Sequence, residues 1–159
     1  SMHLDLTEIN LEVPQSEEII IKCVQDTKEL TDFAKTLASS AAPPRFEAIP
    51  FFEGLKANIL HPDCPFSFYV LYVAGAPASV AVAMHGGSHV GIYYVGTHID
   101  FRNRGLASLT TKYALNIAQS IGCKFAILQA TKMATSLYQK LGFEQHGLFK
   151  GYTMAENGK

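Results

Sequence analysis

The middle of the chain contains three runs of β-forming residues, separated by short glycine-containing turns. The runs cover residues 66–74, 78–85 and 89–98, and the turns are Gly75-Ala76-Pro77 and Gly86-Gly87-Ser88. Alternating β-rich runs and glycine turns of this length are typical of hairpins. The sequence therefore predicts an antiparallel three-stranded meander at the centre of the fold.

The pattern changes to helical periodicity after the meander. Residues 103–121 place apolar side chains on one helical face, and Gly122 follows where a helix can end. Residues 124–130 are apolar on both faces, as in a central strand. Residues 132–141 predict another helix, capped by Gly142, and residues 143–146 and 148–155 predict two short final strands.

The N-terminal part of the chain is less regular. Residues 18–24 predict a strand and residues 26–38 a helix with Asp26 as its N-cap. Residues 46–60 suggest one or two helical turns, interrupted at Pro50. Residues 1–16 suggest only a loose arm or a short helix. Together these elements predict one α/β domain over residues 1–159, with a mixed, mainly antiparallel sheet and helices on both faces.

Composition excludes several classes of function. The net charge of −1 and the absence of a Lys/Arg-rich run disfavour nucleic acid and anionic membranes as partners. The apolar stretches are short and no leader pattern is visible, so we expect a cytoplasmic protein. The three cysteines form no Cys-x-x-Cys pair and the six histidines show no metal-ligand spacing, so no metal is expected.

The junction between the third meander strand and the next helix has the features of a phosphate site. It contains Arg102, Asn103, Arg104 and Gly105, followed by Leu106, Ala107 and Ser108 at the start of the helix. Amides of such a turn and the positive end of the helix dipole can bind an anion, and a glycine lets the oxygens approach the backbone closely. Neither a dinucleotide fingerprint nor a P-loop is present. From these residues alone, a basic turn that merely starts a helix remains an alternative.

Two motifs resemble those of the GNAT superfamily of acyl-CoA-dependent acyltransferases. The first is Arg102-x-x-Gly105-x-Ala107, which resembles the Q/R-x-x-G-x-G/A motif of that superfamily. The second is Leu137-Tyr138-Gln139-Lys140-Leu141-Gly142-Phe143, which follows at the expected distance. The segment Leu128-Gln129-Ala130-Thr131 also resembles a subgroup with Leu-Gln-Ala-Ser/Thr before the last helix. Many members instead have Asn at the position of Thr131.

The resemblance implies a GNAT-like sheet that splays between its fourth and fifth strands and binds acetyl-CoA as co-substrate. Backbone groups of Val95, Gly96 and Thr97 would pair with the pantetheine arm and could polarise the thioester carbonyl. Gly96 fits a bulge in that strand. Residues 103–108 would hold the pyrophosphate. A homodimer is a possible assembly in this superfamily.

The resemblance also implies direct acetyl transfer to a primary amine, on either a small molecule or a peptide. Tyr138 is the candidate general acid, because a phenol can protonate the departing thiolate. A packing aromatic is the simpler interpretation of the same residue. His85, His98 and Glu53 are candidate bases, and nothing in the sequence selects one. A non-catalytic acyl-CoA-binding or partner-binding module on the same fold remains the alternative function.

Overall fold

The computed structural model describes residues 1–13 and 17–148 of the chain. These residues form one sheet with the strand order β2-β3-β4-β5-β6-β1-β7, together with helices and one 3-10 turn. The elements are β1 (Met2–Asp5), β2 (Ile19–Cys23), α1 (Thr27–Ser39), α2 (Ala48–Gly54), α3 (Lys56–Ile59), β3 (Phe66–Val73), β4 (Ala76–Gly86), β5 (His89–Thr97), η1 (Ile99–Phe101), α4 (Leu106–Ser120), β6 (Phe125–Leu128), α5 (Thr135–Lys140) and β7 (Glu144–Gln145).

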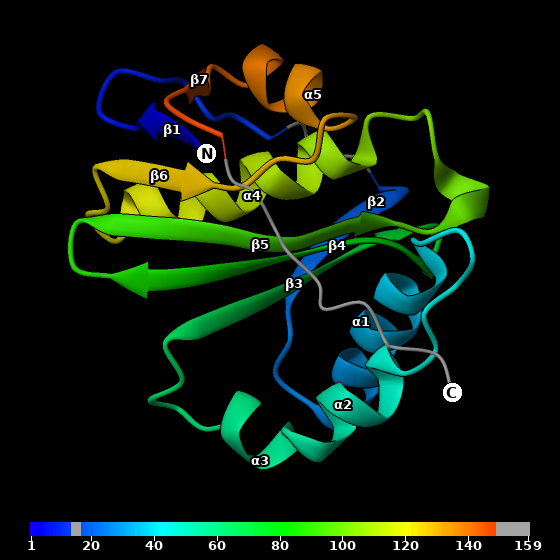
Figure 1. Ribbon diagram of the computed structural model, residues 1–159. Coiled ribbons are helices and arrows are strands. Elements are labelled where there is room, and N and C mark those ends of the chain that lie inside the picture. The colour runs from blue at the N-terminus through cyan, green and yellow to red at the C-terminus, as the bar shows by residue number, and fades with distance from the viewer. Residues whose placement is uncertain (14–16, 149–159) are drawn as a thin grey trace, which may run out of the picture.

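Neighbouring strands of the sheet are antiparallel, except that β5 and β6 run parallel. The predicted meander is confirmed as β3, β4 and β5. Figure 1 shows α1, α2 and α3 on one side of the sheet and α4 and α5 on the other. The mixed, mainly antiparallel α/β class predicted from the sequence is therefore confirmed.

Strand β3 shows why helices are needed on both faces of the sheet. Successive strand residues point to opposite faces, and β3 is apolar at almost every position. Phe68 and Val70 pack in the same cluster as Phe33 of α1. Tyr69, between them in sequence, packs in the cluster that contains Leu115 of α4. A strand of this kind is stable only when both of its faces are covered.

The N-terminal segment is part of the sheet, and the expected loose arm or short helix is wrong for its first residues. Strand β1 pairs antiparallel with β6 on one side and with β7 on the other. Met2 and Leu4 are 2% and 5% exposed, and Leu6 and Leu11 are also buried in the core. The strand was missed because four residues carry little periodicity, and because its partners lie more than a hundred residues away in the chain.

Both helical regions before the meander are present, with one correction. Asp26 caps α1 as predicted, since its Oδ1 accepts a hydrogen bond from the Glu29 amide at 2.8 Å. Pro50, however, does not interrupt the second region and lies in the first turn of α2. An amide in the first turn has no partner within the helix, so a proline there costs no hydrogen bond.

The C-terminal elements are shorter than expected. The helix predicted over residues 132–141 covers only Thr135–Lys140, and the strand predicted over residues 143–146 is reduced to Glu144–Gln145. Of the last predicted strand, over residues 148–155, only Leu148 is described, and it belongs to no strand; the rest lies outside the described residues. No helix among the described residues is both long and apolar enough to cross a bilayer.

Candidate functional site

The turn between β5 and α4 presents a row of unpaired backbone amides. Asn103 and Gly105 have positive φ values of 62° and 72°, which turn the chain sharply before α4 begins at Leu106. Asparagine and glycine are the residues that tolerate this conformation best. Among the described residues, the amides from 103 to 108 donate to no acceptor. Together with the positive end of α4 they have the arrangement expected of an anion-binding site, and anion binding at this turn stays a prediction.

The two arginines of this turn are anchored on the protein. The guanidinium of Arg102 donates to the Ser40 carbonyl at 2.6 Å, at the C-terminal end of α1. Arg104 lies over the ring of Phe101, 5.4 Å from its centroid. Arg102 therefore ties α1 to the turn, because a cation is favourable at a helix C-terminus. The sequence predicted phosphate binding here but did not reveal this link.

Strand β5 has an open edge directly before the turn. It pairs with β6 only from His89↔Phe125 to Ile92↔Leu128, whereas β5 itself continues to Thr97. From residue 93 to residue 97, the side of β5 that faces away from β4 has no neighbouring strand in the described part of the chain. Val95, Gly96 and Thr97 lie on this stretch. The splay implied by the resemblance stays a prediction, but the end of the pairing leaves room for it.

The bulge in β5 lies two residues before the position expected from the sequence. The register against β4 gains one residue of β5 between Val80↔Gly96 and Val82↔Tyr93, and Tyr94 there has a positive φ of 48°. The prediction of a bulge at Gly96 is therefore wrong, since Gly96 is paired.

Gly96 is needed because the end of α1 approaches β5 closely. A Cβ atom on Gly96 would lie 2.6 Å from Ser40 Oγ and 2.9 Å from Ser40 Cβ. Ser40 thus touches both Gly96 and Arg102. Sequence reasoning missed Ser40, which lies beyond the helix predicted over residues 26–38, and no pattern in the sequence marks it.

Tyr138 belongs to the cap of α5, which explains the second motif in physical terms. The amides of Gly142 and Phe143 donate to the carbonyls of Gln139 and Tyr138, both at 3.0 Å, and Gly142 has a φ of 93°. These two bonds form a Schellman motif, which often includes an apolar contact. The contact joins the third-last residue of the helix, here Tyr138, to the residue after the glycine, here Phe143. Here the rings of Tyr138 and Phe143 make that contact, with centroids 5.8 Å apart.

The environment of Tyr138 is compatible with an acid role but does not require one. The side chain is only 7% exposed, and burial raises the pKa of Tyr138 to about 12. The phenol therefore stays protonated at neutral pH. No described residue forms a hydrogen bond to its hydroxyl, so the proton is available to a ligand. Tyr138 belongs to the core cluster that also contains Leu115, and Val95 of β5 packs against that same cluster.

The three candidate bases and Thr131 lie in different surroundings. His85 Nε2 is 3.0 Å from Ser67 Oγ, and burial lowers the pKa of His85. His98 Nδ1 accepts from the Asp100 amide at 3.3 Å, and Glu53 is exposed on α2. The Thr131 side chain is exposed. Its backbone carbonyl accepts hydrogen bonds from the amides of Ala134 and Thr135 at the start of α5.

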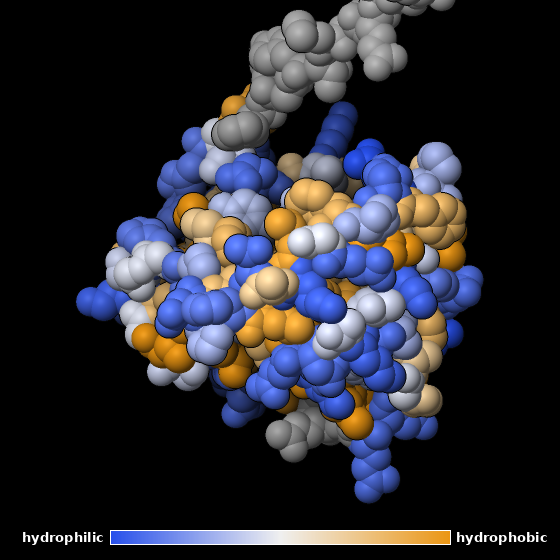
Figure 2. Space-filling model, turned by 90° about the horizontal axis from the view of Figure 1, so that it is seen from below, coloured by the Kyte–Doolittle hydropathy of each residue, from blue (hydrophilic) through white to orange (hydrophobic). Residues whose placement is uncertain are grey.

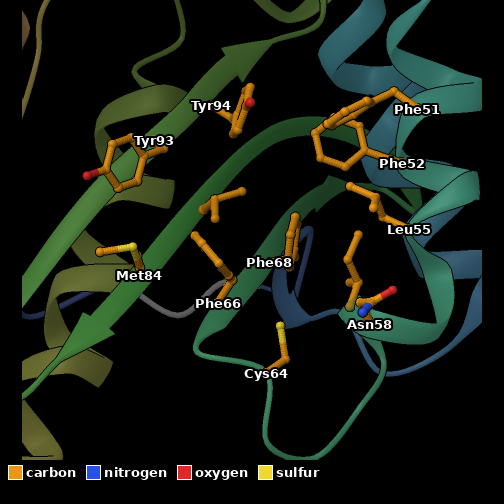
Figure 3. A pocket seen from close by; sticks show the side chains of 12 residues that line it. Phe51, Phe52, Leu55, Asn58, Cys64, Phe66, Phe68, Met84, Tyr93 and Tyr94 are labelled. Atoms are coloured by element: carbon orange, nitrogen blue, oxygen red, sulfur yellow. The ribbon is translucent and has the colours of Figure 1, made fainter.

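An apolar cavity of about 350 Å³ lies between the sheet and the helices α2 and α3. Figure 3 shows side chains that reach it from α2, from α3 and from β3, β4 and β5. None of the three candidate bases lines it, although Tyr93 and Tyr94 of β5 do. The lining residues are Phe51, Phe52, Leu55, Asn58, Ile59, Cys64, Phe66, Phe68, Val82, Met84, Tyr93 and Tyr94.

One group of side chains has the composition of a metal site, which histidine spacing in the sequence did not predict. Ligand atoms of His3, Glu144 and His146 lie within 4.8 Å of one another. His3 and Glu144 face each other across β1 and β7, so only strand pairing brings them together. The group lies at the β7 edge of the sheet, whereas the turn at residues 102–105 follows the central strand β5 (Figure 1).

Comparison with solved structures shows the same fold at low sequence identity. A GCN5-related N-acetyltransferase from Kribbella flavida is 18% identical with a TM-score of 0.67; the match covers 90% of this chain and 52% of that one, so this chain spans about half of its length. Glucosamine-6-phosphate N-acetyltransferase from Arabidopsis thaliana is 17% identical with a TM-score of 0.64, over 86% of this chain and 99% of that one. An acetyltransferase from Trypanosoma brucei is 18% identical with a TM-score of 0.64, over 86% and 99%.

Sequence comparison identifies the family directly. No curated protein matches the chain. The family model for the acetyltransferase (GNAT) domain matches residues 65–145, which include the meander, the turn at residues 102–108 and both motifs. This match covers half of the chain and agrees with the fold of the structural neighbours. The chain belongs to the GNAT family of acetyltransferases.

Proposed function

We propose that the protein transfers an acetyl group from acetyl-CoA directly to a primary amine. The observation that carries this proposal is the row of unpaired amides from 103 to 108, which follows the open edge of β5 after the short 3-10 turn η1. The amides would hold the pyrophosphate of acetyl-CoA, and the Ser108 hydroxyl, which has no partner among the described residues, adds a donor. The guanidinium groups of Arg102 and Arg104 add positive charge beside it.

The open edge of β5 would place the thioester next to the acceptor. Backbone groups of Val95, Gly96 and Thr97 would pair with the pantetheine arm, and an amide of this stretch would stabilise the oxyanion that forms when the amine attacks. The C–N bond forms first and gives the tetrahedral oxyanion, whose collapse breaks the C–S bond, and the attacking amine releases one proton to water. No acyl-cysteine intermediate is required.

Tyr138 would protonate the departing thiolate. A phenol with a pKa of about 12 is a weaker acid than a thiol in water, whose pKa is about 8.5. Desolvation also raises the proton affinity of a thiolate, so a thiolate released in the same apolar surroundings is a better acceptor than in water. Transfer from Tyr138 depends on this shared desolvation.

The proposal is tested by titrating acetyl-CoA in a calorimeter with two matched glycine variants. Gly105 and Gly87 have φ values of +72° and +60°, and a Cβ on either would meet nothing within 4 Å. Glu at either position therefore carries a similar backbone strain of about 1–2 kcal/mol. Only Gly105→Glu should abolish binding, by blocking and repelling the phosphates. Wild-type protein that binds no acetyl-CoA, or equal loss in Gly87→Glu, contradicts the proposal.

A non-catalytic acyl-CoA-binding module is the second candidate, because the cavity beside β5 contains none of the three candidate bases. Such a module would bind acetyl-CoA with the same dependence on Gly105 but would release no CoA thiol. A panel of amines assayed for free thiol separates the two functions. The panel should include glucosamine 6-phosphate, the substrate named for the Arabidopsis neighbour. A homodimer stays a prediction, to be checked by light scattering.

A further inference from the structure

We propose that the apolar cavity beside β5 binds the acceptor, and that this acceptor is a weakly basic amine attached to an aromatic or branched apolar group. The inference rests on the proposed acetyl transfer and adds the substrate class to it. The cavity lies against Tyr93 and Tyr94, directly before the stretch of β5 assigned to the thioester.

The chemistry of the lining selects an apolar body. Phe51 and Phe52 project from α2, and Phe66 and Phe68 project from β3 on the opposite side (Figure 3). The rings of Phe52 and Phe68 are edge-to-face, with centroids 6.1 Å apart. No lining residue in the described part of the chain carries a formal charge at neutral pH. A charged sugar phosphate or a polyamine would therefore lose hydration in this cavity without gaining an ion pair.

The size of the cavity fits a small molecule. A cavity of about 150 Å³ is enough to bind benzene. The volume here is about 350 Å³, so it can accept a group larger than a single phenyl ring. At the rim, Phe51, Leu55 and Phe66 are 55%, 39% and 39% exposed. Figure 2 shows apolar patches among hydrophilic residues when the molecule is viewed from below, the side on which α1, α2 and α3 lie in Figure 1.

The backbone of β5 brings the cavity to the reaction site. At the bulge, Tyr94 contacts Phe52 of α2 with ring centroids 5.5 Å apart. The ring of Tyr93 lies over Gly91, where a Cβ would come within 2.6 Å of it. Both tyrosines therefore lie at the boundary between the cavity and the open edge. An acceptor seated in the cavity would present its amine toward residues 95–97.

None of the candidate bases lines the cavity, and this limits how basic the reacting amine can be. His85, His98 and Glu53 do not line the cavity. The reacting amine must therefore reach the thioester largely uncharged. At pH 8 about half of an α-amine, with a pKa near 7.7–8.0, is neutral, against about 0.4% of a lysine-type amine with a pKa near 10.4. An α-amine beside an apolar side chain meets both requirements.

The test compares phenylalanine amide with glycine amide, which share an α-amine and differ in the apolar group, together with spermidine and glucosamine 6-phosphate. We expect kcat/KM for phenylalanine amide to exceed that of the other three by at least about tenfold. Leu55→Asp, which puts a carboxylate at the rim, should remove most of this preference and leave the Kd for acetyl-CoA unchanged. The control is Ile20→Asp, at a 51% exposed position on β2 outside the cavity, which should change neither. Equal use of both amides, or preference for spermidine or the sugar phosphate, overturns the inference.

Binding measured without acetyl-CoA separates this inference from the proposed function. Saturation-transfer NMR should show phenylalanine amide bound to wild type and to Ile20→Asp, and bound much more weakly to Leu55→Asp. If this pattern is seen while acetyl-CoA does not bind, the acetyl transfer is refuted and the cavity remains a site for apolar amines. If acetyl-CoA binds but the three proteins bind the amide equally or not at all, the assignment of the cavity is refuted.

Discussion

Substitution of Tyr138 by Phe tests whether the second motif carries chemistry or only packing. The ring of Tyr138 completes the cap of α5 by contact with Phe143, and Phe keeps that ring. The hydroxyl has no hydrogen-bond partner among the described residues, so its removal should change the free energy of unfolding by less than about 1 kcal/mol. Tyr138→Ala would instead remove a buried ring and cost about 3–5 kcal/mol.

The kinetic effect should be much larger than the effect on stability. A positioned general acid contributes about 10²–10⁴-fold to the rate. We therefore expect Tyr138→Phe to lower kcat at least about 100-fold, equal to about 2.7 kcal/mol in the activation free energy. The Kd for acetyl-CoA should stay within about twofold of wild type, because the turn proposed to hold the pyrophosphate is untouched.

The assay is release of free CoA thiol at saturating acetyl-CoA, beside calorimetric Kd values and urea unfolding of each variant. An unchanged kcat in a well-folded Tyr138→Phe protein would refute the acid role and leave Tyr138 as part of the helix cap. A fall in kcat together with loss of stability above about 1 kcal/mol would show that the ring position had moved. In that case the packing argument made from the Schellman motif would be wrong.

Three further predictions concern stability. Gly96→Ala forces a methyl group within 2.6 Å of Ser40 Oγ. It should lower the free energy of unfolding in urea by about 1–3 kcal/mol and raise the Kd for acetyl-CoA. Unchanged values would refute the close approach. Asp26→Ala should lower the free energy of unfolding by about 1 kcal/mol and leave the affinity for acetyl-CoA unchanged, because it removes only the hydrogen bond from the Glu29 amide. An unchanged midpoint of urea unfolding would contradict the cap. The pKa of Tyr138 is about 12 in the folded protein against about 10 in the unfolded chain, so its contribution to the free energy of unfolding is complete below pH 10 and is lost as pH rises toward 12. At pH 11 the free energy of unfolding of wild type should therefore have fallen by about 1.4 kcal/mol more than that of Tyr138→Phe. Equal losses in the two proteins would refute the burial effect.

Local patterns in the sequence were sufficient for the elements whose causes are local. The three meander strands alternate with glycine turns, Asp26 supplies its own cap contact three residues ahead, and Gly142 ends α5 with a positive φ. The conformation of the turn before α4 is also local, because Asn103 and Gly105 adopt positive φ directly before a helix. These features depend on residues a few positions apart, so their order in the chain was enough to predict them.

Other features were predicted imperfectly because their causes lie elsewhere in the chain. The sequence predicts a break at Pro50, but whether a proline breaks a helix depends on where the helix starts, and Pro50 lies in the first turn of α2. The bulge was assigned to Gly96 because glycine permits one, but the extra residue lies at Tyr94 and Gly96 serves the approach of Ser40. A glycine in the sequence indicates either an unusual backbone conformation or a close approach by another residue. The residue packed against it in the folded protein shows which of the two applies.

Periodicity and local backbone preference were enough to predict the α/β class and the meander, and the same local pattern predicts phosphate binding at the turn before α4. Tertiary structure decided that Met2–Asp5 is a sheet strand, since its partners are β6 and β7 at the other end of the chain. It also brought Arg102 to the end of α1 and formed an open apolar cavity between α2, α3 and the sheet. Such contacts arise from the packing of surfaces that are distant in sequence, and a residue's local pattern does not specify its distant neighbour.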